Sequence, residues 1–254
     1  MNDLLELERV SFSYDSSPLL QDISFGVKEG EIFIVAGQCG HGKSTLLKIC
    51  AGLLKPKSGT VRLMGSFLNE IPEIKLRELR LELGYVFQNA ALIFNLNIFE
   101  NIALPLRYHK RLDEETIRRL VAARLELVKI LGYEKRFPAE LSMGIRKHAA
   151  IARALALSPR LILMDEPTSG LDPINSKSVA ELIVALKKEY GVSTIMVTHD
   201  IHYAFPIADR IGILNEQQLL AVDLPQRLLK SENAFVRNFL SGLAVSPGFS
   251  KTKG

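Results

Sequence analysis

The stretch GQCGHGKST, residues 37–45, decides the fold class of this chain. Gly37 is followed by four residues and then by Gly42, Lys43 and Ser44, which is the spacing of a phosphate-binding loop. Glycines in such a loop let backbone N–H groups approach phosphate oxygens, and the positive end of the following helix adds to the attraction. The loop therefore predicts a nucleotide-binding α/β protein.

The flanks of the loop have the pattern that the motif requires. EIFIVAG (31–37) is a continuous apolar run, typical of a strand buried on both faces. STLLKICAGL (44–53) has a helical period, with three residues expected to face inward: Leu46, Leu47 and Cys50. A chance glycine-rich turn is the alternative, and the order strand, loop, helix argues against it.

The composition is that of an ordinary globular protein. The chain has 254 residues, of which 47% are hydrophobic and 24% charged, which allows one large domain or two small ones. The net charge of +4 is spread over many residues, so no nucleic-acid partner is expected. Cys39 and Cys50 lack metal-ligand spacing and form no disulfide framework, which fits a reduced, cytosolic setting. The acidic start and the lack of an apolar run of ~18 residues predict neither a secretory signal nor a membrane helix.

Strand patterns surround a helical middle part. Beyond the strand before the loop, apolar runs predict strands at 4–14, 59–65, 160–167, 191–200 and 210–217. We expect a mostly parallel core sheet with an antiparallel β part, interrupted by an inserted α-helical subdomain at about 89–157. Residues 1–228 would form one nucleotide-binding domain, and 229–254 a C-terminal extension.

Three apolar patterns predict which individual residues lie on one face of a strand or helix. In the first strand, Val10, Phe12 and Tyr14 share one face. The insertion has a helical stripe of six residues: Ile117, Leu120, Val121, Leu125, Val128 and Leu131. The extension has another, which Gly242 and Pro247 would terminate, made of Phe235, Val236, Phe239, Leu240 and Leu243. This last stripe is expected to hold two subunits together; packing against its own subunit is the alternative.

Nine residues are expected to surround the nucleotide phosphates. Lys43 would reach the β- and γ-phosphates, and Ser44 would ligate Mg²⁺. The whole set is Gly37, Gln38, Cys39, Gly40, His41, Gly42, Lys43, Ser44 and Thr45.

Two carboxylates follow a second buried strand. In RLILMDEPTSG (160–170), the apolar run leads into Asp165 and Glu166 at the strand's C-terminal end, where open parallel sheets bind ligands. Asp165 suits the Mg²⁺ shell, and Glu166 suits a general base that polarises the attacking water. A surface turn is the alternative for an isolated Asp-Glu pair, and the phosphate loop makes the catalytic interpretation the stronger one.

His199 and Gln88 are polar residues at other strand ends. His199 ends the strand in IMVTHD and could contact the γ-phosphate, although a lone histidine is more often structural. Gln88 lies where LGYVF meets the insertion, and could contact Mg²⁺ or water when nucleotide is bound. From its own position alone, Gln88 is an ordinary surface glutamine.

A second anion-binding helix start lies in LSMGIRK, 141–147. The hydroxyl of Ser142 and the N–H of Gly144 would form it. One γ-phosphate does not need two such sites in one chain, so we expect this one to serve the opposite subunit of a dimer.

Together these stretches resemble the ATP-binding subunit of an ABC transporter, over about residues 4–225. GQCGHGKS resembles the Walker A motif of that family, LILMDE its Walker B motif, and LSMGI its LSGGQ signature. Gln88 resembles the Q-loop glutamine, SGLD (169–172) the D-loop, and His199 the switch histidine. Tyr14 lies where the family stacks an aromatic ring on adenine.

The resemblance implies cofactors, partners and a location. The cofactors are ATP and Mg²⁺, and the assembly is a head-to-tail homodimer with each ATP between Walker A of one subunit and the signature of the other. Integral-membrane permease subunits would contact the chain near Gln88, at the cytoplasmic face of the inner membrane. Met143 and Ile145 depart from the signature, which leaves the turnover rate open.

A narrower resemblance indicates lipid transport. GYVFQNAALIFNLNIFENIALPLR (84–107) and VRNFLSGLAVSPGF (236–249) look like the ATPases of MCE-type phospholipid transporters. This resemblance implies an MCE-type lipid-binding protein in the complex. The alternatives are an amino-acid or metal importer, and a soluble ABC ATPase that acts outside transport.

Overall fold

A six-stranded, mostly parallel sheet forms the centre of the fold. The computed structural model describes residues 3–110, 112–241 and 243. The strand order is β10-β9-β3-β8-β7-β6, and all neighbours are parallel except β9 and β10. The strands are β3 (Ile32–Gly37), β6 (Leu83–Val86), β7 (Leu161–Asp165), β8 (Ser193–Thr198), β9 (Arg210–Asn215) and β10 (Gln218–Asp223). The predicted parallel core is confirmed.

The central strands are buried on both faces, as the continuous apolar run of β3 predicts. Every residue of β3, β7 and β8 is buried. In β3, Ile32 and Ile34 pack into one hydrophobic cluster, while Phe33 and Val35 pack into another on the opposite face. Successive side chains of a strand point to opposite faces, so only a strand covered on both sides needs such an uninterrupted apolar run.

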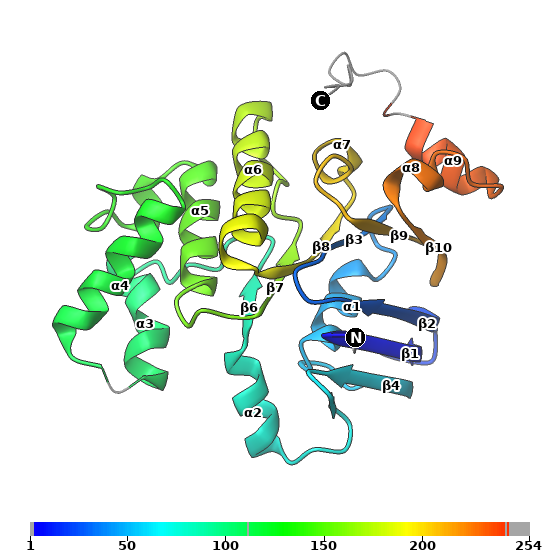
Figure 1. Cartoon of the computed structure of the whole chain (residues 1–254), viewed down its shortest axis with the longest axis horizontal. Helices are drawn as coiled ribbons and strands as arrows, with labels where there is room; N and C mark the ends of the chain where they lie inside the picture. The colour runs from blue at the N-terminus through cyan, green and yellow to red at the C-terminus, as the bar shows by residue number, and fades with distance from the viewer. Residues whose placement is uncertain (1–2, 111, 242, 244–254) are drawn as a thin grey trace.

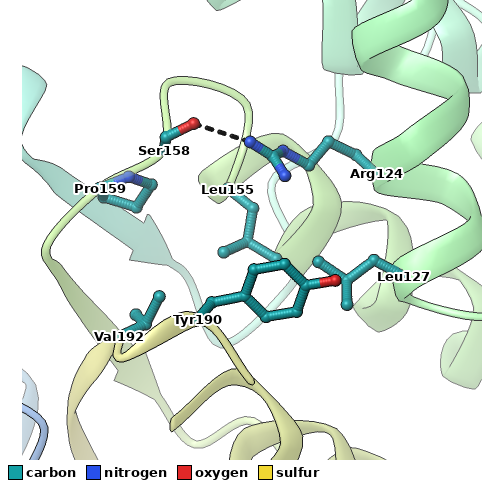
Figure 2. Close-up of a pocket in the computed structure, with 7 residues that line it drawn as sticks. All are labelled: Arg124, Leu127, Leu155, Ser158, Pro159, Tyr190 and Val192. Atoms are coloured by element: carbon teal, nitrogen blue, oxygen red, sulfur yellow. Dashed lines mark hydrogen bonds between the residues drawn. The ribbon is translucent and has the colours of Figure 1, made fainter. Parts of the chain in front are cut away.

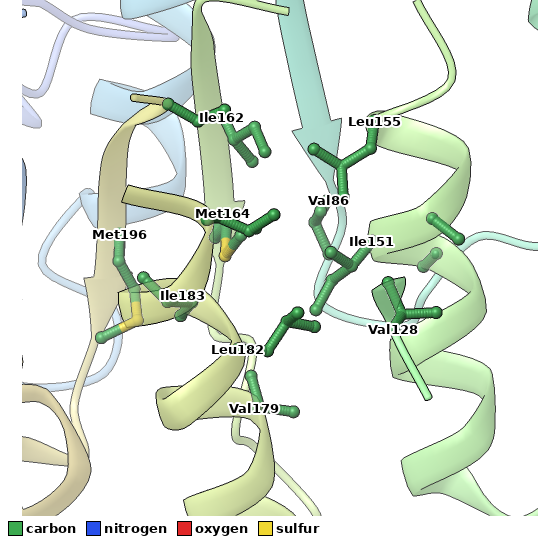
Figure 3. Packing of buried hydrophobic residues seen from close by; sticks show 14 of the residues in the cluster. Val86, Val128, Ile151, Leu155, Ile162, Met164, Val179, Leu182, Ile183 and Met196 are labelled. Atoms are coloured by element: carbon green, nitrogen blue, oxygen red, sulfur yellow. The ribbon is translucent and has the colours of Figure 1, made fainter. Parts of the chain in front are cut away.

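Helices α5 and α6 cover one face of this sheet. Figure 3 shows Ile162 and Met164 of β7 packed against Ile151 and Leu155 of α5. Three residues of α6 complete the contact: Val179, Leu182 and Ile183. These helices are α5 (Met143–Ala154) and α6 (Pro173–Tyr190), and α1 (Lys43–Cys50) packs against β3, β7 and β8.

An antiparallel sheet forms the predicted second β part. Its order is β2-β1-β4-β5, made of β1 (Leu5–Phe12), β2 (Leu20–Val27), β4 (Ser58–Leu63) and β5 (Ser66–Phe67). Val10 and Phe12 are buried as expected. Tyr14 was wrongly placed on the strand, since β1 ends at Phe12 and the Tyr14 side chain is 59% exposed. The register also shifts between Leu7 and Val10, which interrupts the alternation.

The inserted helices lie together on one side of the molecule (Figure 1). They are α3 (Ile98–His109), α4 (Glu114–Leu127), the short 3-10 turn η1 (Pro138–Glu140) and α5. The predicted inward stripe is confirmed up to Val128, with Leu120 only partly buried, but Leu131 is 60% exposed. Because Lys129 has a left-handed φ of 59°, the helix stops before it, and Ile130 is buried in place of Leu131.

The remaining helices are α2 (Glu73–Leu81), α7 (Ile201–Ala204), α8 (Pro225–Leu228) and α9 (Ala234–Ser241). Helix α9 contains most of the predicted C-terminal stripe. Val236, Leu240 and Leu243 are buried in the chain's own large hydrophobic cluster. Phe235 and Phe239 are partly buried against the same cluster, with ring centroids 6.1 Å apart.

This packing supports the alternative that the stripe covers its own subunit. A role of the extension in holding two subunits together stays a prediction. Gly242 and Pro247, the expected terminators, lie outside the described residues.

We expect Leu240→Ala to lower the free energy of unfolding by about 2–5 kcal/mol, because the leucine is 1% exposed and its loss leaves a cavity. Asn238→Ala, on the exposed side of α9, is the control and should change it by less than ~0.5 kcal/mol. Denaturant unfolding of the full chain measures both values. Equal stability of the two variants would show that α9 is not part of the core.

Candidate active site

The predicted motifs lie at one edge of the parallel sheet because β3, β7 and β8 are neighbours. Strand β3 leads into the phosphate loop, β7 ends at Asp165, and β8 ends at Thr198. The register pairs Ala36 with Thr198 and Asp165 with Val197, so the three carboxyl ends are level. Segments that are more than a hundred residues apart in the sequence therefore meet at this edge.

The phosphate loop needs its glycines for two physical reasons. Gly42 precedes α1 with a left-handed φ of 90°, a conformation that costs glycine little. A Cβ on Gly37 would lie 2.2 Å from the carbonyl oxygen of Leu214, so only glycine allows β3 and β9 to approach at this point. Gln38, Cys39 and Gly40 are exposed between them. Their backbone is therefore accessible to a ligand.

Lys43 is buried at the start of α1. It is 5% exposed, and its Nζ donates hydrogen bonds of 2.9 Å to the carbonyl oxygens of Gly37 and Gln38. The same Nζ lies 3.7 Å from Oε1 of Glu166. The lysine charge is thus held between the loop and the carboxylate predicted to be the general base.

Ser44 and Asp165 are in direct contact. The Ser44 hydroxyl donates a 2.8 Å hydrogen bond to Oδ1 of Asp165. Burial raises the pKa of Asp165, an effect that the bond from Ser44 opposes. Mg²⁺ takes few protein ligands beside waters and phosphates, and it prefers hard oxygens. A hydroxyl and a buried carboxylate at hydrogen-bonding distance fit that donor set.

Glu166 is oriented by the end of β8. Its Oε2 accepts hydrogen bonds from the Thr198 hydroxyl at 3.0 Å and from the backbone N–H of His199 at 3.3 Å. The Nδ1 of His199 lies 2.9 Å from the same oxygen. Glu166 is 5% exposed, whereas the His199 side chain is 45% exposed. A buried carboxylate held beside an accessible imidazole can accept and pass on a proton.

Tyr14 and Thr45 form the outer side of the loop. The Tyr14 hydroxyl lies 3.3 Å from Oγ1 of Thr45, and its ring packs edge-on against Phe12 with centroids 5.0 Å apart. The exposed ring face suits a stacking partner such as adenine. The His41 side chain contacts the turn between β9 and β10, where its Nδ1 accepts a 3.4 Å hydrogen bond from the N–H of Glu216.

Gln88 reaches the site through its backbone. Its side chain is exposed just beyond β6, and its carbonyl oxygen accepts a hydrogen bond from Nζ of Lys147. The same Nζ donates to the carbonyl oxygen of Glu166 at 3.0 Å. Lys147 is 0% exposed, and burial lowers its pKa to about 8.

Ser142 and Gly144 are not brought to the phosphate loop. Ser142 caps α5 by accepting a 3.4 Å hydrogen bond from the N–H of Ile145. Helix α5 packs against α3, α4, α6 and β6, and Figure 1 shows it well apart from α1. Gly144 also has a local role, since a Cβ there would lie 2.7 Å from Oδ1 of Asn175.

Sequence reasoning missed two residues of the site, Thr198 and Lys147. Thr198 directly precedes His199 at the end of a strand, and this position indicates a residue of the site. Lys147 lies one helical turn from both Gly144 and Ile151, on the buried face of α5. Lysine is rare on the buried face of a helix, so this position indicates a residue with a specific role.

A separate cavity of about 140 Å³ lies away from these residues. Figure 2 shows Arg124 of α4 donating a 2.7 Å hydrogen bond to the Ser158 hydroxyl, with Tyr190 and Leu127 nearby. The cavity is lined by both the insertion and the core, so the Arg124–Ser158 bond links the two. It contains none of the predicted nucleotide-binding residues.

Comparison with known sequences identifies relatives over the whole chain. A family model described as "ABC transporter" matches residues 20–169. The chain is 37% identical over 100% of its length, and 73% of the relative's, to the "Probable ribonucleotide transport ATP-binding protein mkl" of Mycobacterium leprae. It is 35% identical, over 96% of its length and 93% of the relative's, to the "Intermembrane phospholipid transport system ATP-binding protein MlaF" of Haemophilus influenzae.

Two solved structures are similar to this chain in fold. The ATP-binding cassette MJ0796, solved as a dimer in a post-hydrolysis state bound to ADP and Pi, has a TM-score of 0.80 and 31% identity, covering 87% of this chain and 98% of that one. The cbiO1 protein of Clostridium perfringens, part of the transporter complex cbiONQ, has a TM-score of 0.83 and 28% identity, covering 96% and 97%.

We expect Glu166→Gln to lower the rate of ATP hydrolysis by about 10²–10⁴-fold, because the amide cannot accept the proton of the attacking water. ATP binding should persist, since Lys43, Ser44 and Asp165 are unchanged. Steady-state phosphate release and equilibrium ATP binding measure the two effects. Glu189→Gln, the same change on an exposed residue, is the control. A turnover rate near that of the control would show that Glu166 is not the general base.

We expect maleimide to label Cys39 and not Cys50, and Mg-ATP to protect Cys39. Cys39 is exposed in the phosphate loop, whereas Cys50 is fully buried and burial raises the pKa of its thiol to about 12. Peptide mapping after brief labelling, with and without Mg-ATP, decides the outcome. Label on Cys50 would report unfolding. Equal labelling of Cys39 in both conditions would place it outside the nucleotide contact.

Proposed function

The chain belongs to the ABC transporter family and is an ATP-hydrolysing subunit, and we propose that it powers the movement of phospholipids between the membranes of a bacterial envelope. The observation that carries this proposal is the match to the "Intermembrane phospholipid transport system" ATPases. It covers 96% of this chain together with 93% and 91% of the relatives from Haemophilus influenzae and Escherichia coli K12. The similarity thus extends over nearly the whole length of this chain and of each phospholipid transport ATPase.

Ribonucleotide transport is the second candidate. The mycobacterial relatives named for it are 37% identical, slightly above the 35% of the phospholipid ATPases. However, the match covers only 73% and 70% of those relatives' length. None of the relatives reported above is named as an amino-acid or metal importer.

In the proposed reaction, water attacks the γ-phosphate of ATP and the products are ADP and phosphate. Lys43 and the loop N–H groups bind the β- and γ-phosphates, and Ser44 and Asp165 would hold Mg²⁺. Bound Mg²⁺ would neutralise charge on the phosphate oxygens. Glu166 takes the proton from the attacking water. The 2.9 Å contact between His199 Nδ1 and Glu166 Oε2 supports the role of His199 in holding this carboxylate.

Each nucleotide site needs a second subunit in this proposal. The N-terminal end of α5, with Ser142 and Gly144, lies apart from the phosphate loop of its own chain (Figure 1). Cassettes of this family form dimers, and the relative MJ0796 is dimeric in two solved structures. We therefore infer a head-to-tail homodimer in which Ser142 and Gly144 complete the partner's site through backbone and hydroxyl donors.

The membrane subunits would dock beside Gln88. A cavity of about 400 Å³ there is lined by Phe87, Ile93, Pro105 and Arg153 among others. Phe94, in the same segment as Ile93, is 61% exposed. An apolar recess bordered by exposed aromatic side chains suits an amphipathic helix of a permease.

Attachment to the membrane would therefore come from partners. No helix in the part of the chain that the structure describes is long and apolar enough to cross a membrane. We propose that the chain lies at the cytoplasmic face of the inner membrane, bound to permease subunits. An MCE-type lipid-binding protein would belong to the same complex.

We expect the purified complex, reconstituted in vesicles, to move fluorescent phospholipid to acceptor vesicles only when Mg-ATP is present. The complex containing Glu166→Gln is the matched control and should show no ATP-dependent transfer. Uptake of labelled ribonucleotide is measured on the same vesicles. ATP-dependent ribonucleotide uptake without phospholipid transfer would overturn the phospholipid assignment and support the second candidate.

A further inference from the structure

Lys147 is a buried charge that the proposed reaction does not use. Its side chain is 0% exposed and is among the largest that are fully buried. It makes no ion pair with any described carboxylate, and its Nζ donates instead to the carbonyl oxygens of Gln88 and Glu166. A buried ammonium group is costly unless its hydrogen bonds are satisfied, so these two contacts define where the group must stay.

One of these contacts holds a strained residue. Glu166 has a left-handed φ of 47°, a conformation that a non-glycine residue keeps only when its surroundings enforce it. Its N–H donates to the carbonyl oxygen of Val197 at 2.9 Å, and its own carbonyl oxygen accepts from the N–H of Ser169 at 3.2 Å. The 3.0 Å bond from Lys147 adds the only contact among these three that comes from the inserted helices.

The other contact fastens the Gln88 segment to α5. Arg153, farther along the same helix, donates to the carbonyl oxygens of Ala91 at 2.7 Å and Ala90 at 3.0 Å. Ala90 and Ala91 both have left-handed φ values, of 61° and 47°. Helix α5 therefore holds this segment at two points, through Lys147 and Arg153, and the two should move together.

We propose that Lys147 is a positioning residue, which ties the backbone of Glu166 to α5 and to the Gln88 segment and so sets the direction of the Glu166 carboxylate. A shift of α5 relative to β7 would therefore change the Lys147–Glu166 contact. That change would alter the position of the Glu166 carboxylate relative to Thr198 and His199. Hydrolysis then depends on the position of the inserted helices, which also border the cavity beside Gln88.

The inference rests on the proposed role of Glu166 as general base. Glu166→Gln by itself tests that role, so a failure of the assignment can be recognised before Lys147 is considered. The test of Lys147 uses the full chain and compares Lys147→Met, which removes the donors but keeps an unbranched side chain, with the unchanged protein. Lys188→Met is the matched control, since Lys188 is exposed on α6.

We expect Lys147→Met to lower kcat by about 10²-fold, the effect of a small misplacement of a catalytic group, while the equilibrium affinity for ATP stays unchanged. Lys147→Arg should recover much of the loss, because a guanidinium can donate to both carbonyl oxygens. If the methionine variant does not fold, Lys147→Gln replaces it, since its shorter amide cannot span both carbonyls. Lys188→Met should behave like the unchanged chain.

A double-variant cycle separates positioning from general structural damage. If Lys147 acts through Glu166, then Lys147→Met added to Glu166→Gln should not lower the residual rate further. Three results overturn the proposal. The first is a kcat of Lys147→Met equal to that of the Lys188→Met control. The second is a loss of kcat of the same size in the presence and absence of the Glu166 carboxylate. The third is a loss that appears as weakened ATP binding.

Discussion

The parallel pairing of β3, β7 and β8 is the constraint on which the active site depends. Their level register places the phosphate loop, Asp165 and Thr198 at one edge, and every other contact of the site builds on that alignment. All three strands are buried on both faces, so layers of helix or sheet cover both sides of them. Strand β8 also contains buried hydroxyl groups: that of Ser193 accepts a hydrogen bond from the N–H of Gly30, and that of Thr198 donates one to Glu166.

Charge balance is the second requirement of this edge. Two lysines, Lys43 and Lys147, and two carboxylates, Asp165 and Glu166, are each at most 5% exposed. Buried charges persist only with partners. Here the two lysines donate hydrogen bonds to backbone carbonyl oxygens, the two carboxylates accept them from hydroxyl groups, and charges of opposite sign are near each of them. The arrangement places positive charge where phosphates would bind and negative charge where a cation and a water would be held.

Helix α5 links two functions that lie far apart. Its N-terminal end lies apart from its own phosphate loop and is proposed to complete the site of a second subunit. Farther along the helix, buried Lys147 and partly buried Arg153 hold the Gln88 segment. The cavity proposed for the permease borders the same helix. A helix with these contacts can relate the state of the membrane partner to the geometry of Glu166, because packed helices shift as rigid units rather than bend.

The sequence by itself determined the fold class and the order of the motifs along the chain. It also predicted Lys43, Ser44, Asp165, Glu166 and His199, which the structure brings together at one edge of the sheet. Local signals suffice for these features: glycine spacing for the loop, apolar runs for β3 and β7, and Ser142 as a helix cap. Only the tertiary structure decided that Leu131 faces solvent, that Tyr14 lies beyond its strand, and that α9 packs on its own core. It alone also revealed Lys147 between Gln88 and Glu166. The physical reason is that helix ends, backbone carbonyl partners and the burial of one face are set by contacts between segments distant in sequence, and no local pattern records them.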